Sequence, residues 1–564
     1  MESPRPAAGA PVDDGPSLAE VHEAIGRARP DAECLVFRDR RFTWAEVEDR
    51  TRRLANALGD RGLGCRTERS DLADHESGQD HLAIYLHNGN EYLESMLGAL
   101  KARVASLNVN YRYVADELRY LLTDSRAAAV VVHSCFAPVL DEVRAELPDL
   151  RVVLQVADDS DVGLLDGAEW YEDVLAAASP RRPDVDWSPD DLYLLYTGGT
   201  TGMPKGVMWR NGDAMRECFG GSATATDVEG FVADASQELR SLLAPPFMHG
   251  AGHWMSFRTW LSGGTVVVQS HPERLDPVDI WSTVERERIE FLLIVGDAFA
   301  RPLLDELDAG TYDLSSLGVL LSGGAALSAP AKTEFLEHLP TLMVVDGLGS
   351  SEAGGQVSHV STGSGASTGT FAMTEGNAVL SADLDRVLGP GDPEIGWLAK
   401  TGRLALGYLG DPDKTARTYP TVDGRRYAIP GDRARLLAEP DDDGDGDREP
   451  GLGIVELHGR DSVTINSGGE KIFAEEVEAA MKAHSAVHDC VVAGRPSERW
   501  GSEVVAVVRI RDGHEATDAE LVETMGRHIA RYKIPKRIVR VDEIVRSPSG
   551  KADYRWARSI ATSD

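Results

Sequence analysis

Short apolar runs that end in glycine and small polar residues alternate with amphipathic stretches along most of this chain. Residues 43–62 have the spacing of an amphipathic helix, 81–86 and 127–134 are apolar and strand-like, and 114–125 are again helical. A pattern that switches in this way between helix and strand predicts parallel strands joined by covering helices. We therefore expect an α/β fold whose large N-terminal domain consists mainly of parallel sheets covered by helices.

The same pattern returns further along the chain, where apolar runs lead directly into turn-forming residues. These runs lie at 263–270, 289–299, 317–327 and 341–352. Open α/β sheets bind ligands beyond the carboxyl ends of their strands. The glycine-rich exits of these four runs are therefore candidate ligand sites.

Three polar stretches interrupt the regular pattern and are expected to lie at the surface. Residues 66–80 look like a surface insertion, and residues 354–371, rich in Gly, Ser and Thr, are expected to be flexible. The acidic residues 439–453 lack the spaced ligands and closing Glu of an EF-hand loop, which favours a solvated hairpin loop over a calcium site.

From Ala474 onward the pattern favours a separate small α+β domain of about 100 residues. The spacing predicts helices at 474–485 and 518–532, and strands at 487–495, 503–510 and 536–544.

Composition sets the broad class of protein. A chain of 564 residues is too long for one compact core, and 42% hydrophobic with 27% charged residues is usual for a globular protein. We find no apolar run of about 18 residues that would span a membrane, and no signal peptide. The five cysteines have no CxxC spacing, which predicts reduced thiols in a cytoplasmic protein.

The charge distribution restricts the possible partners. A formal net charge of −34 argues against nucleic acid or an anionic membrane surface. Residues 527–558, however, hold ten Lys/Arg against three Asp/Glu. This basic segment is either a solvated face or a patch that binds a polyanionic small molecule.

The loop "YTGGTTGMPKG" at 196–206 has the residues that hold phosphate but not the Walker spacing. It follows an apolar strand, and its glycines and threonines offer backbone amides and hydroxyls for an anion. Lys205 stands between Pro204 and Gly206, so no adjacent hydroxyl can bind a metal as in a Walker loop. A generic Gly/Thr turn of this kind would be a flexible surface loop, but the full string is highly specific.

This loop resembles the phosphate loop of the adenylate-forming superfamily, which includes acyl-CoA synthetases and adenylation domains of peptide synthetases. Further motifs similar to those of the superfamily follow in order and cover nearly the whole chain, at 245–252, 322–327, 346–354, 427–432, 459–478 and 547–557. The resemblance implies a two-step reaction in which a carboxylate attacks the α-phosphate of ATP and a thiol, usually coenzyme A, then displaces AMP. ATP, Mg²⁺ and CoA are the expected cofactor and co-substrates.

The resemblance also implies roles for individual residues. Glu352 would hold Mg²⁺, and Lys551 would lie between the carboxylate and the α-phosphate. His249 is either a hydrogen-bonded core histidine or the ring that shapes the carboxylate entry. The loop contacts to the departing phosphates would come from Thr197, Gly198, Gly199, Thr200, Thr201 and Lys205, with Thr200 and Thr201 as the main hydroxyls.

Nucleotide contacts are expected at the other motifs. Asp432 offers two oxygens to the ribose diol, and Arg460 fits a ribose or phosphate contact. The backbone near adenine and the acyl group would be Gly323, Gly324 and Ala325, and the neighbouring strand end would contribute Asp346, Gly347, Leu348, Ser350 and Ser351.

A hinge is expected at Asp461–Ser462, which would divide the chain into domains 1–460 and 461–564 and make the second one mobile. Many members of the superfamily carry Asp or Lys where Ser462 stands, so this chain departs from the superfamily pattern at the hinge. Gly468, Gly469 and Lys471 belong to the loop that would admit the pantetheine arm of CoA. Lys533 and Lys536 in the basic segment are candidates for the CoA phosphates.

These features predict an ATP-dependent acyl-CoA ligase. An acyl-AMP ligase that loads a separate carrier protein, a luciferase-like oxidase and a non-catalytic nucleotide-binding scaffold are the alternatives. The wider motifs are most similar to actinobacterial fatty-acyl and steroid side-chain CoA ligases, so a lipophilic small-molecule carboxylic acid is the expected substrate. Residues 250–252 fit either a roomy acyl pocket or tight helix packing. The sequence does not indicate an oligomeric state.

Overall fold

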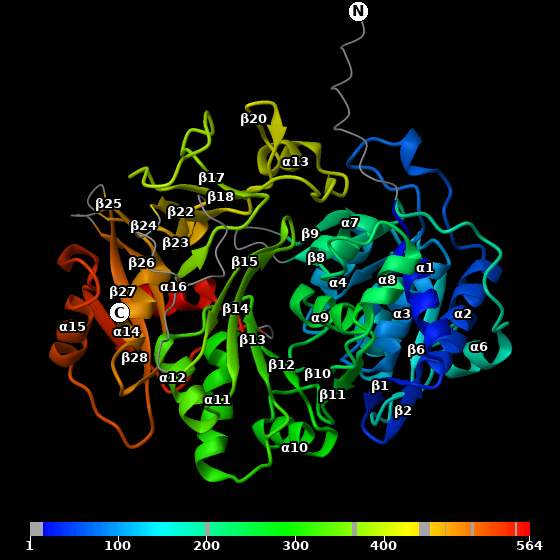
Figure 1. Cartoon of the computed structure of the whole chain (residues 1–564), viewed down its shortest axis with the longest axis horizontal. Helices are drawn as coiled ribbons and strands as arrows, with labels where there is room; N and C mark the ends of the chain where they lie inside the picture. The colour runs from blue at the N-terminus through cyan, green and yellow to red at the C-terminus, as the bar shows by residue number, and fades with distance from the viewer. Residues whose placement is uncertain are drawn as a thin grey trace, which may run out of the picture.

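The computed structural model describes residues 15–197, 203–363, 369–438, 452–467, 470–497, 501–547 and 550–563. Figure 1 shows the N-terminal half in blue to green beside a C-terminal part in orange and red. Most of the acidic stretch at 439–453 lies outside the described residues, so its loop conformation stays a prediction. None of the helices among the described residues combines the length and apolar character that a bilayer crossing requires.

The first sheet is entirely parallel, as the alternation predicts. Its strand order is β4-β3-β5-β6-β7, with β4 Ala105–Asn108, β3 His81–Tyr85, β5 Ala127–His133, β6 Val152–Val156 and β7 Glu169–Trp170. Alternate residues of β3 face two different hydrophobic clusters, one with helices α2 and α3 and the other with α4 and α5. Helices therefore cover both faces. They are α2 Trp44–Asp60, α3 Asn90–Lys101, α4 Ala115–Asp124 and α5 Ala137–Arg144, and α6 Tyr171–Ala177 follows β7.

The second sheet has eight strands and is parallel except at its two edges. The order is β15-β14-β13-β12-β10-β11-β1-β2, with β15 Gly354–Ser361, β14 Met343–Ser350, β13 Val319–Gly323, β12 Phe291–Ile294, β10 Arg240–Leu243, β11 Thr265–Val268, β1 Glu33–Phe37 and β2 Arg40–Thr43. The helices that accompany it in the chain are α1 Leu18–Ala28, α7 Asn211–Glu217, α8 Val228–Asp234, α9 Gly250–Leu261, α10 Pro277–Glu287, α11 Gly296–Ala309 and α12 Ala329–His338. The glycine-rich exits of β13 and β14 lie side by side at the carboxyl ends of these two strands.

The prediction of a flexible stretch at 354–371 is wrong for most of its described length. Residues 354–361 form the edge strand β15, which pairs antiparallel with β14, and β16 (Thr370–Ala372) begins at the end of the stretch. Backbone pairing to an already formed neighbour supplies the hydrogen bonds, so low strand propensity is overridden by tertiary context.

A third sheet is antiparallel. Its order is β16-β23-β22-β18-β17, with β23 Ile454–Arg460, β22 Asp432–Leu437, β18 Gly396–Lys400 and β17 Asn377–Leu380. Close to it lie the hairpin of β8 (Leu192–Thr197) and β9 (Lys205–Arg210), extended by β19 (Gly407–Tyr408), helix α13 (Pro412–Thr418), and the pair β20 (Thr421–Val422) and β21 (Arg425–Arg426).

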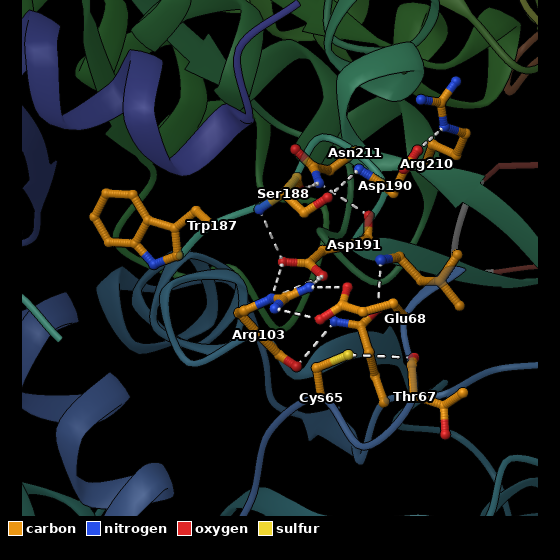
Figure 2. A network of polar contacts seen from close by, with 12 residues as sticks. Cys65, Thr67, Glu68, Arg103, Trp187, Ser188, Asp190, Asp191, Arg210 and Asn211 are labelled. Carbon is orange, nitrogen blue, oxygen red and sulfur yellow. Dashed lines mark hydrogen bonds and ion pairs between the residues drawn. The ribbon is translucent and has the colours of Figure 1, made fainter. Parts of the chain in front are cut away.

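Figure 2 shows the polar network that anchors the insertion at 66–80 to the start of this hairpin. The Arg103 guanidinium binds Glu68 at 2.8 Å and Asp191 at 2.9 Å. Asn211, directly after β9, donates to the Asp191 carbonyl at 2.9 Å. The network therefore fixes the end of the hairpin that lies opposite the phosphate loop.

The C-terminal part is the predicted α+β unit. It contains the hairpin β24 (Ile465–Ser467) and β25 (Glu470–Ile472), a sheet of order β26-β27-β28, and three helices. Their bounds are α14 Ala474–Lys482, β26 Val487–Ser497, β27 Gly501–Ile510, α15 Asp518–Gly526, β28 Arg537–Arg540 and α16 Tyr554–Thr562. Helix α15 ends at Gly526, earlier than predicted, because glycine is a poor helix former and the next amides bond back into the last turn.

Candidate active site

The predicted catalytic lysine lies at the glycine-rich exit of β13. It belongs to the lysine loop, the turn between Arg546 and Ala552, whose ends form a β-bridge. A Cβ atom on Gly324 would lie 3.7 Å from Cε of Lys551, so the two predicted site residues are in contact range. Gly550, at φ +73°, packs against Val295, and a Cβ there would lie 3.1 Å from the Val295 carbonyl oxygen.

Charged residues from three motifs surround the Lys551 ammonium group. Part of the side chain is accessible to solvent, yet the surrounding protein desolvates the ammonium and lowers its pKa to about 8. The Arg460 guanidinium acts in the same direction, while Glu352 and Asp432 oppose it. The structure thus brings together Lys551, Glu352, Asp432 and Arg460, which are far apart in the sequence.

Asp432 and Arg460 occupy facing positions on two neighbouring strands. Asp432 begins β22, Arg460 ends β23, and the two residues are partners in the antiparallel register. Arg460 Nε lies 3.4 Å from Asp432 Oδ1, and Asp432 is buried. The Asp461 amide, next to the predicted hinge, donates to the Gly431 carbonyl at 3.0 Å.

Glu352 follows β14 and is held by two tyrosines. The Tyr408 hydroxyl donates to Glu352 Oε1 at 2.8 Å, and the Tyr419 hydroxyl donates to the Glu352 carbonyl at 3.3 Å. The Lys414 ammonium lies over the Tyr408 ring, 3.9 Å from its centroid. The carboxylate is thus oriented by a hydrogen bond on one oxygen.

The phosphate loop is only partly described. Thr197 ends β8 and pairs with Lys205 at the start of β9, while the predicted contacts Gly198, Gly199, Thr200 and Thr201 lie outside the described residues. Lys205 Nζ forms an ion pair with Asp124 at 2.9 Å, and the Tyr196 hydroxyl donates to the same carboxylate at 3.0 Å. Lys205 is therefore bound at the base of the loop.

The residues expected near adenine lie on the paired ends of β13 and β14. Gly323 and Gly347 are register partners, and Gly324 and Ala325 follow at the strand exit. Asp346 forms an ion pair with the fully buried Lys332, and burial raises the pKa of the Asp346 carboxyl although Lys332 opposes the shift. The other members of this set are Leu348 in β14, Ser350, whose hydroxyl accepts from the Ala353 amide at 3.1 Å, and Ser351, whose carbonyl accepts from Trp209 at 2.8 Å.

His249 differs from the core histidine that follows it. Both ring nitrogens of His253 are hydrogen-bonded, Nδ1 to the Phe247 carbonyl at 2.6 Å and Nε2 to the Tyr193 hydroxyl. His249 Nε2 has no hydrogen-bond partner among the described residues. Burial, and secondly the nearby Lys551 cation, lower the pKa of His249 to about 3. A neutral ring with an open nitrogen beside Lys551 favours the entry role over the core role.

The glycines around His249 favour tight packing over a roomy pocket. A Cβ on Gly252 would lie 2.8 Å from the Pro246 carbonyl oxygen, and one on Gly250 would lie 3.1 Å from the Trp254 ring. The acyl group must therefore be accommodated elsewhere than in the space left by these missing side chains.

Three supporting residues were missed by sequence reasoning. Asn108 bonds the strand before the phosphate loop and the segment before His249, and Tyr408 orients Glu352. Glu475 accepts from the Arg460 amide at 3.4 Å, and burial raises its pKa to about 8. The available signals were the polar Asn108 inside an apolar run and Glu475 within the motif at 459–478.

The loop that would admit CoA lies largely outside the described residues. This applies to Gly468, Gly469 and the side chain of Lys471, whose backbone belongs to β25. Of the basic candidates, Lys533 forms an ion pair with Glu476 at 2.6 Å, while Lys536 is exposed.

Comparison with known proteins identifies the family of this chain. A family model described as AMP-binding enzyme matches residues 22–409, and one described as AMP-binding enzyme C-terminal domain matches residues 476–551. The chain is 50% identical over 554 residues to the medium-chain acyl-CoA ligase Mig of Mycobacterium avium, a match that covers 97% of this chain and 98% of the relative. It is 39% identical to a 3-oxocholest-4-en-26-oate–CoA ligase of Rhodococcus rhodochrous, with 96% and 95% covered.

Solved structures show the same fold at lower identity. An anthranilate CoA ligase, AuaEII, in complex with anthranoyl-AMP has a TM-score of 0.80 at 21% identity and covers 98% of both chains. ATP-bound MatB from Rhodopseudomonas palustris has a TM-score of 0.78 at 23% identity and covers 97% of this chain and 99% of its own.

The fold is that of adenylate-forming enzymes, as the sequence motifs predicted. The chain belongs to the AMP-binding enzyme family. Within that family, the prediction of an AMP-forming acyl-CoA ligase that acts on a small-molecule acid, with ATP and CoA, is confirmed. The domain boundary at 460/461 and the individual residue roles stay predictions.

Proposed function

We propose that this chain activates a lipophilic carboxylic acid as its acyl-adenylate and transfers the acyl group to CoA. The observation that carries the proposal is the convergence of Lys551, Glu352, Asp432 and Arg460 at the exit of β13. Cations and fixed dipoles at one place suit a reaction in which two anions must approach each other.

In the first step a carboxylate oxygen attacks the α-phosphorus, and the bond to the bridging oxygen of pyrophosphate breaks. The Lys551 ammonium would lie between the two anions and neutralise the charge that develops. Asp432 would accept hydrogen bonds from the ribose hydroxyls, and its contact with Arg460 holds the carboxylate in place. His249, kept neutral, would line the entry of the acid without competing for the phosphate charge.

Mg²⁺ fits this site through Glu352. Its carboxylate offers the hard oxygen that Mg²⁺ prefers, and Tyr408 orients it. Among the described residues no group of three or more His, Cys, Asp or Glu could hold a metal ion, so phosphate oxygens and water would complete the shell. The ion would neutralise charge on the phosphate oxygens.

The second step places different residues at the acyl-adenylate. The CoA thiol attacks the acyl carbonyl carbon, the thiol proton is lost to solvent, and the bond to AMP breaks. The proposal includes a movement of residues 461–564 about Asp461–Ser462. This movement would bring Gly468, Gly469 and Lys471 into the site. The exposed Lys536 is a better candidate for the CoA phosphates than Lys533, which is already paired with Glu476.

The proposed substrate class is a medium- or long-chain fatty acid or a steroid side-chain acid. Relatives named for medium-chain acyl groups and for 3-oxocholest-4-en-26-oate, matched over nearly their whole length, support it. CoA-dependent AMP release should be measured with octanoate, laurate, palmitate and a steroid side-chain acid, with acetate and benzoate as controls. Preference for acetate or benzoate would refute the substrate class.

The five cysteines form no disulfide, which supports a cytoplasmic location.

The role of Lys551 is tested by separating the two steps. Lys551→Ala should lower acid-dependent pyrophosphate release about 1,000-fold, because a unit charge at 4 Å in a partly solvated site is worth about 4 kcal/mol. Thioester formation from supplied acyl-adenylate should change little. Pyrophosphate release at the wild-type rate would refute the role, and absence of thioester with free CoA would favour a carrier-protein acceptor.

A further inference from the structure

A buried ion pair joins the C-terminal part to the N-terminal part close to the site. Lys482 Nζ, at the end of α14, lies 2.9 Å from Asp297 Oδ2 in the first turn of α11. The side chains are only 10% and 2% exposed. Burying two charges is costly, and loss of one partner leaves the other charge buried and uncompensated. An ion pair between α14 and α11 therefore requires the C-terminal part to lie against the N-terminal part as it does in this structure.

On the N-terminal side Asp297 is fixed to the loop that carries Gly324. The Ser328 amide donates to Asp297 Oδ1 at 2.8 Å, and the Asp297 amide donates to the Ala326 carbonyl at 3.3 Å. The preceding Gly296, at φ +51°, approaches so closely that a Cβ would lie 2.6 Å from the Ala326 carbonyl oxygen. Hydrogen bonds and close backbone packing thus hold Asp297 against the residues that follow β13.

On the C-terminal side a second ion pair, between Arg546 and Asp489, reaches the lysine loop, and Asp489 also acts electrostatically on Lys482. Burial alone would lower the pKa of Lys482, but Asp297 and Asp489 outweigh it and raise the pKa, so the ammonium stays charged. Arg546 binds both Asp489 oxygens at 2.7 Å and donates to the Gly550 carbonyl at 3.0 Å. Gly550 is the residue directly before Lys551.

The lysine loop also contacts the residues on either side of Gly296 and Asp297. A Cβ on Gly550 would lie 3.1 Å from the Val295 carbonyl oxygen and 3.3 Å from Ala298 Cβ, and these two residues flank Gly296 and Asp297. The ion pair and the contact between Gly550 and Val295 therefore belong to one interface between the N-terminal and C-terminal parts. Lys551 lies at the end of this interface that is next to Gly324.

We propose that Asp297 and Lys482 are positioning residues that seat Lys551 at the glycine exit of β13 for the acyl-adenylate step. The inference rests on the proposed role of Lys551 in that step. It adds a residue pair to those that the sequence motifs identify. Loss of either charge leaves the partner buried and unpaired, which moves the interface and with it the ammonium.

The test uses the full-length protein and assays the two steps separately. Asp297→Asn keeps the acceptor for the Ser328 amide, and Lys482→Met keeps the volume of the side chain. Each should lower acid-dependent pyrophosphate release roughly 10- to 100-fold, since a misplacement of about 1 Å can cost about 100-fold. Thioester formation from supplied acyl-adenylate should stay within about twofold of wild type, which also shows that the variant is folded.

Two comparisons make the result specific. Arg495→Met is the matched control, because Arg495 pairs with Glu503 inside one C-terminal hairpin, with Nε 2.9 Å from the carboxylate. Its pyrophosphate release should match wild type. In a Lys551→Ala background, Asp297→Asn should cause no further loss, because residues that act through one group are not additive.

The outcomes separate the inference from the proposed function. If Lys551→Ala lowers pyrophosphate release but Asp297→Asn and Lys482→Met do not, the positioning inference is refuted and the role of Lys551 stands. If both variants lower the two steps equally, or if Asp297→Asn lowers the rate further without Lys551, the pair is merely structural and the inference is also refuted. If Lys551→Ala has no effect, the proposed role of Lys551 itself fails.

Discussion

A single buried amide, Asn108 at the end of β4, holds two segments of the site together. Its Nδ2 donates to the Tyr196 carbonyl at 2.8 Å and the Met248 carbonyl at 2.7 Å, and its Oδ1 accepts from the Tyr196 amide at 2.8 Å. Tyr196 precedes the phosphate loop, and Met248 precedes His249. Substitution Asn108→Leu removes all three bonds and replaces the amide by an apolar side chain that branches at the same carbon.

The expected effect follows from the three backbone groups that lose their partner. Each orphaned buried group costs about 1–3 kcal/mol, so the native arrangement loses at least about 3 kcal/mol unless the segments move to find water. Movement of the end of β8 is the expected response, because two of the three groups belong to Tyr196. A shift there should lower kcat/KM for ATP roughly 10- to 100-fold.

The assay is acid-dependent pyrophosphate release over a range of ATP concentrations, together with thermal unfolding. Asn110→Leu is the matched control, because among the described residues its side chain accepts one local bond, from the Arg112 amide at 3.0 Å, and its kinetics should match wild type. If Asn108→Leu unfolds at the wild-type temperature and also keeps the wild-type kcat/KM for ATP, the bridging role is wrong. Equal losses in both variants would likewise contradict it.

Three further outcomes are expected. The pKa of Glu475 is raised to about 8, so between about pH 5 and 8 the folded state keeps a proton that the unfolded state has lost. The thermal midpoint should therefore fall as pH rises through this window, and Glu475→Gln should remove that slope, which an unchanged slope would contradict. Lys101→Met removes a fully buried ammonium that binds Glu48 and Thr51, and urea unfolding should show a loss of about 3–5 kcal/mol, whereas a wild-type midpoint would show the network to be neutral. Because the pKa of His249 is lowered to about 3, pH profiles of kcat/KM for the acid should run parallel in wild type and His249→Phe from about pH 5 to 8, and an inflection near pH 6.5 lost in the variant would refute a neutral His249.

The sequence predicted the parallel sheets because their strands are buried on both faces and read as continuous apolar runs. Residues 127–133 are an example, with helices packed on either side. It did not predict β15 or the antiparallel sheet around β22 and β23. Strands such as 354–361 carry glycine and polar residues, and their stability comes from a neighbouring strand that is distant or not evident in the pattern.

For the candidate site, motifs predicted which residues converge, but not what holds them. Lys551 and Gly324, for example, come from two different motifs and lie within contact range. The partners Asp124, Lys332, Tyr408 and Asp297 went unnoticed because each lies outside the motifs and is recognisable only through a contact made in space. Sequence spacing reports local geometry, whereas these pairs join elements that are far apart in the chain.

The burial of each partner decides which predicted contacts remain open to the nucleotide. The pair of Lys205 and Asp124 is 27% and 17% exposed, and a partly solvated pair of this kind contributes about 1 kcal/mol or less. A triphosphate carries more negative charge than one carboxylate, so exchange of Asp124 for phosphate costs little. Lys332, paired with Asp346, is fully buried, and breaking such a pair costs about 3–5 kcal/mol. Under the proposed function, Lys205 can therefore move to the phosphates, whereas the Asp346 carboxylate is expected to stay with Lys332.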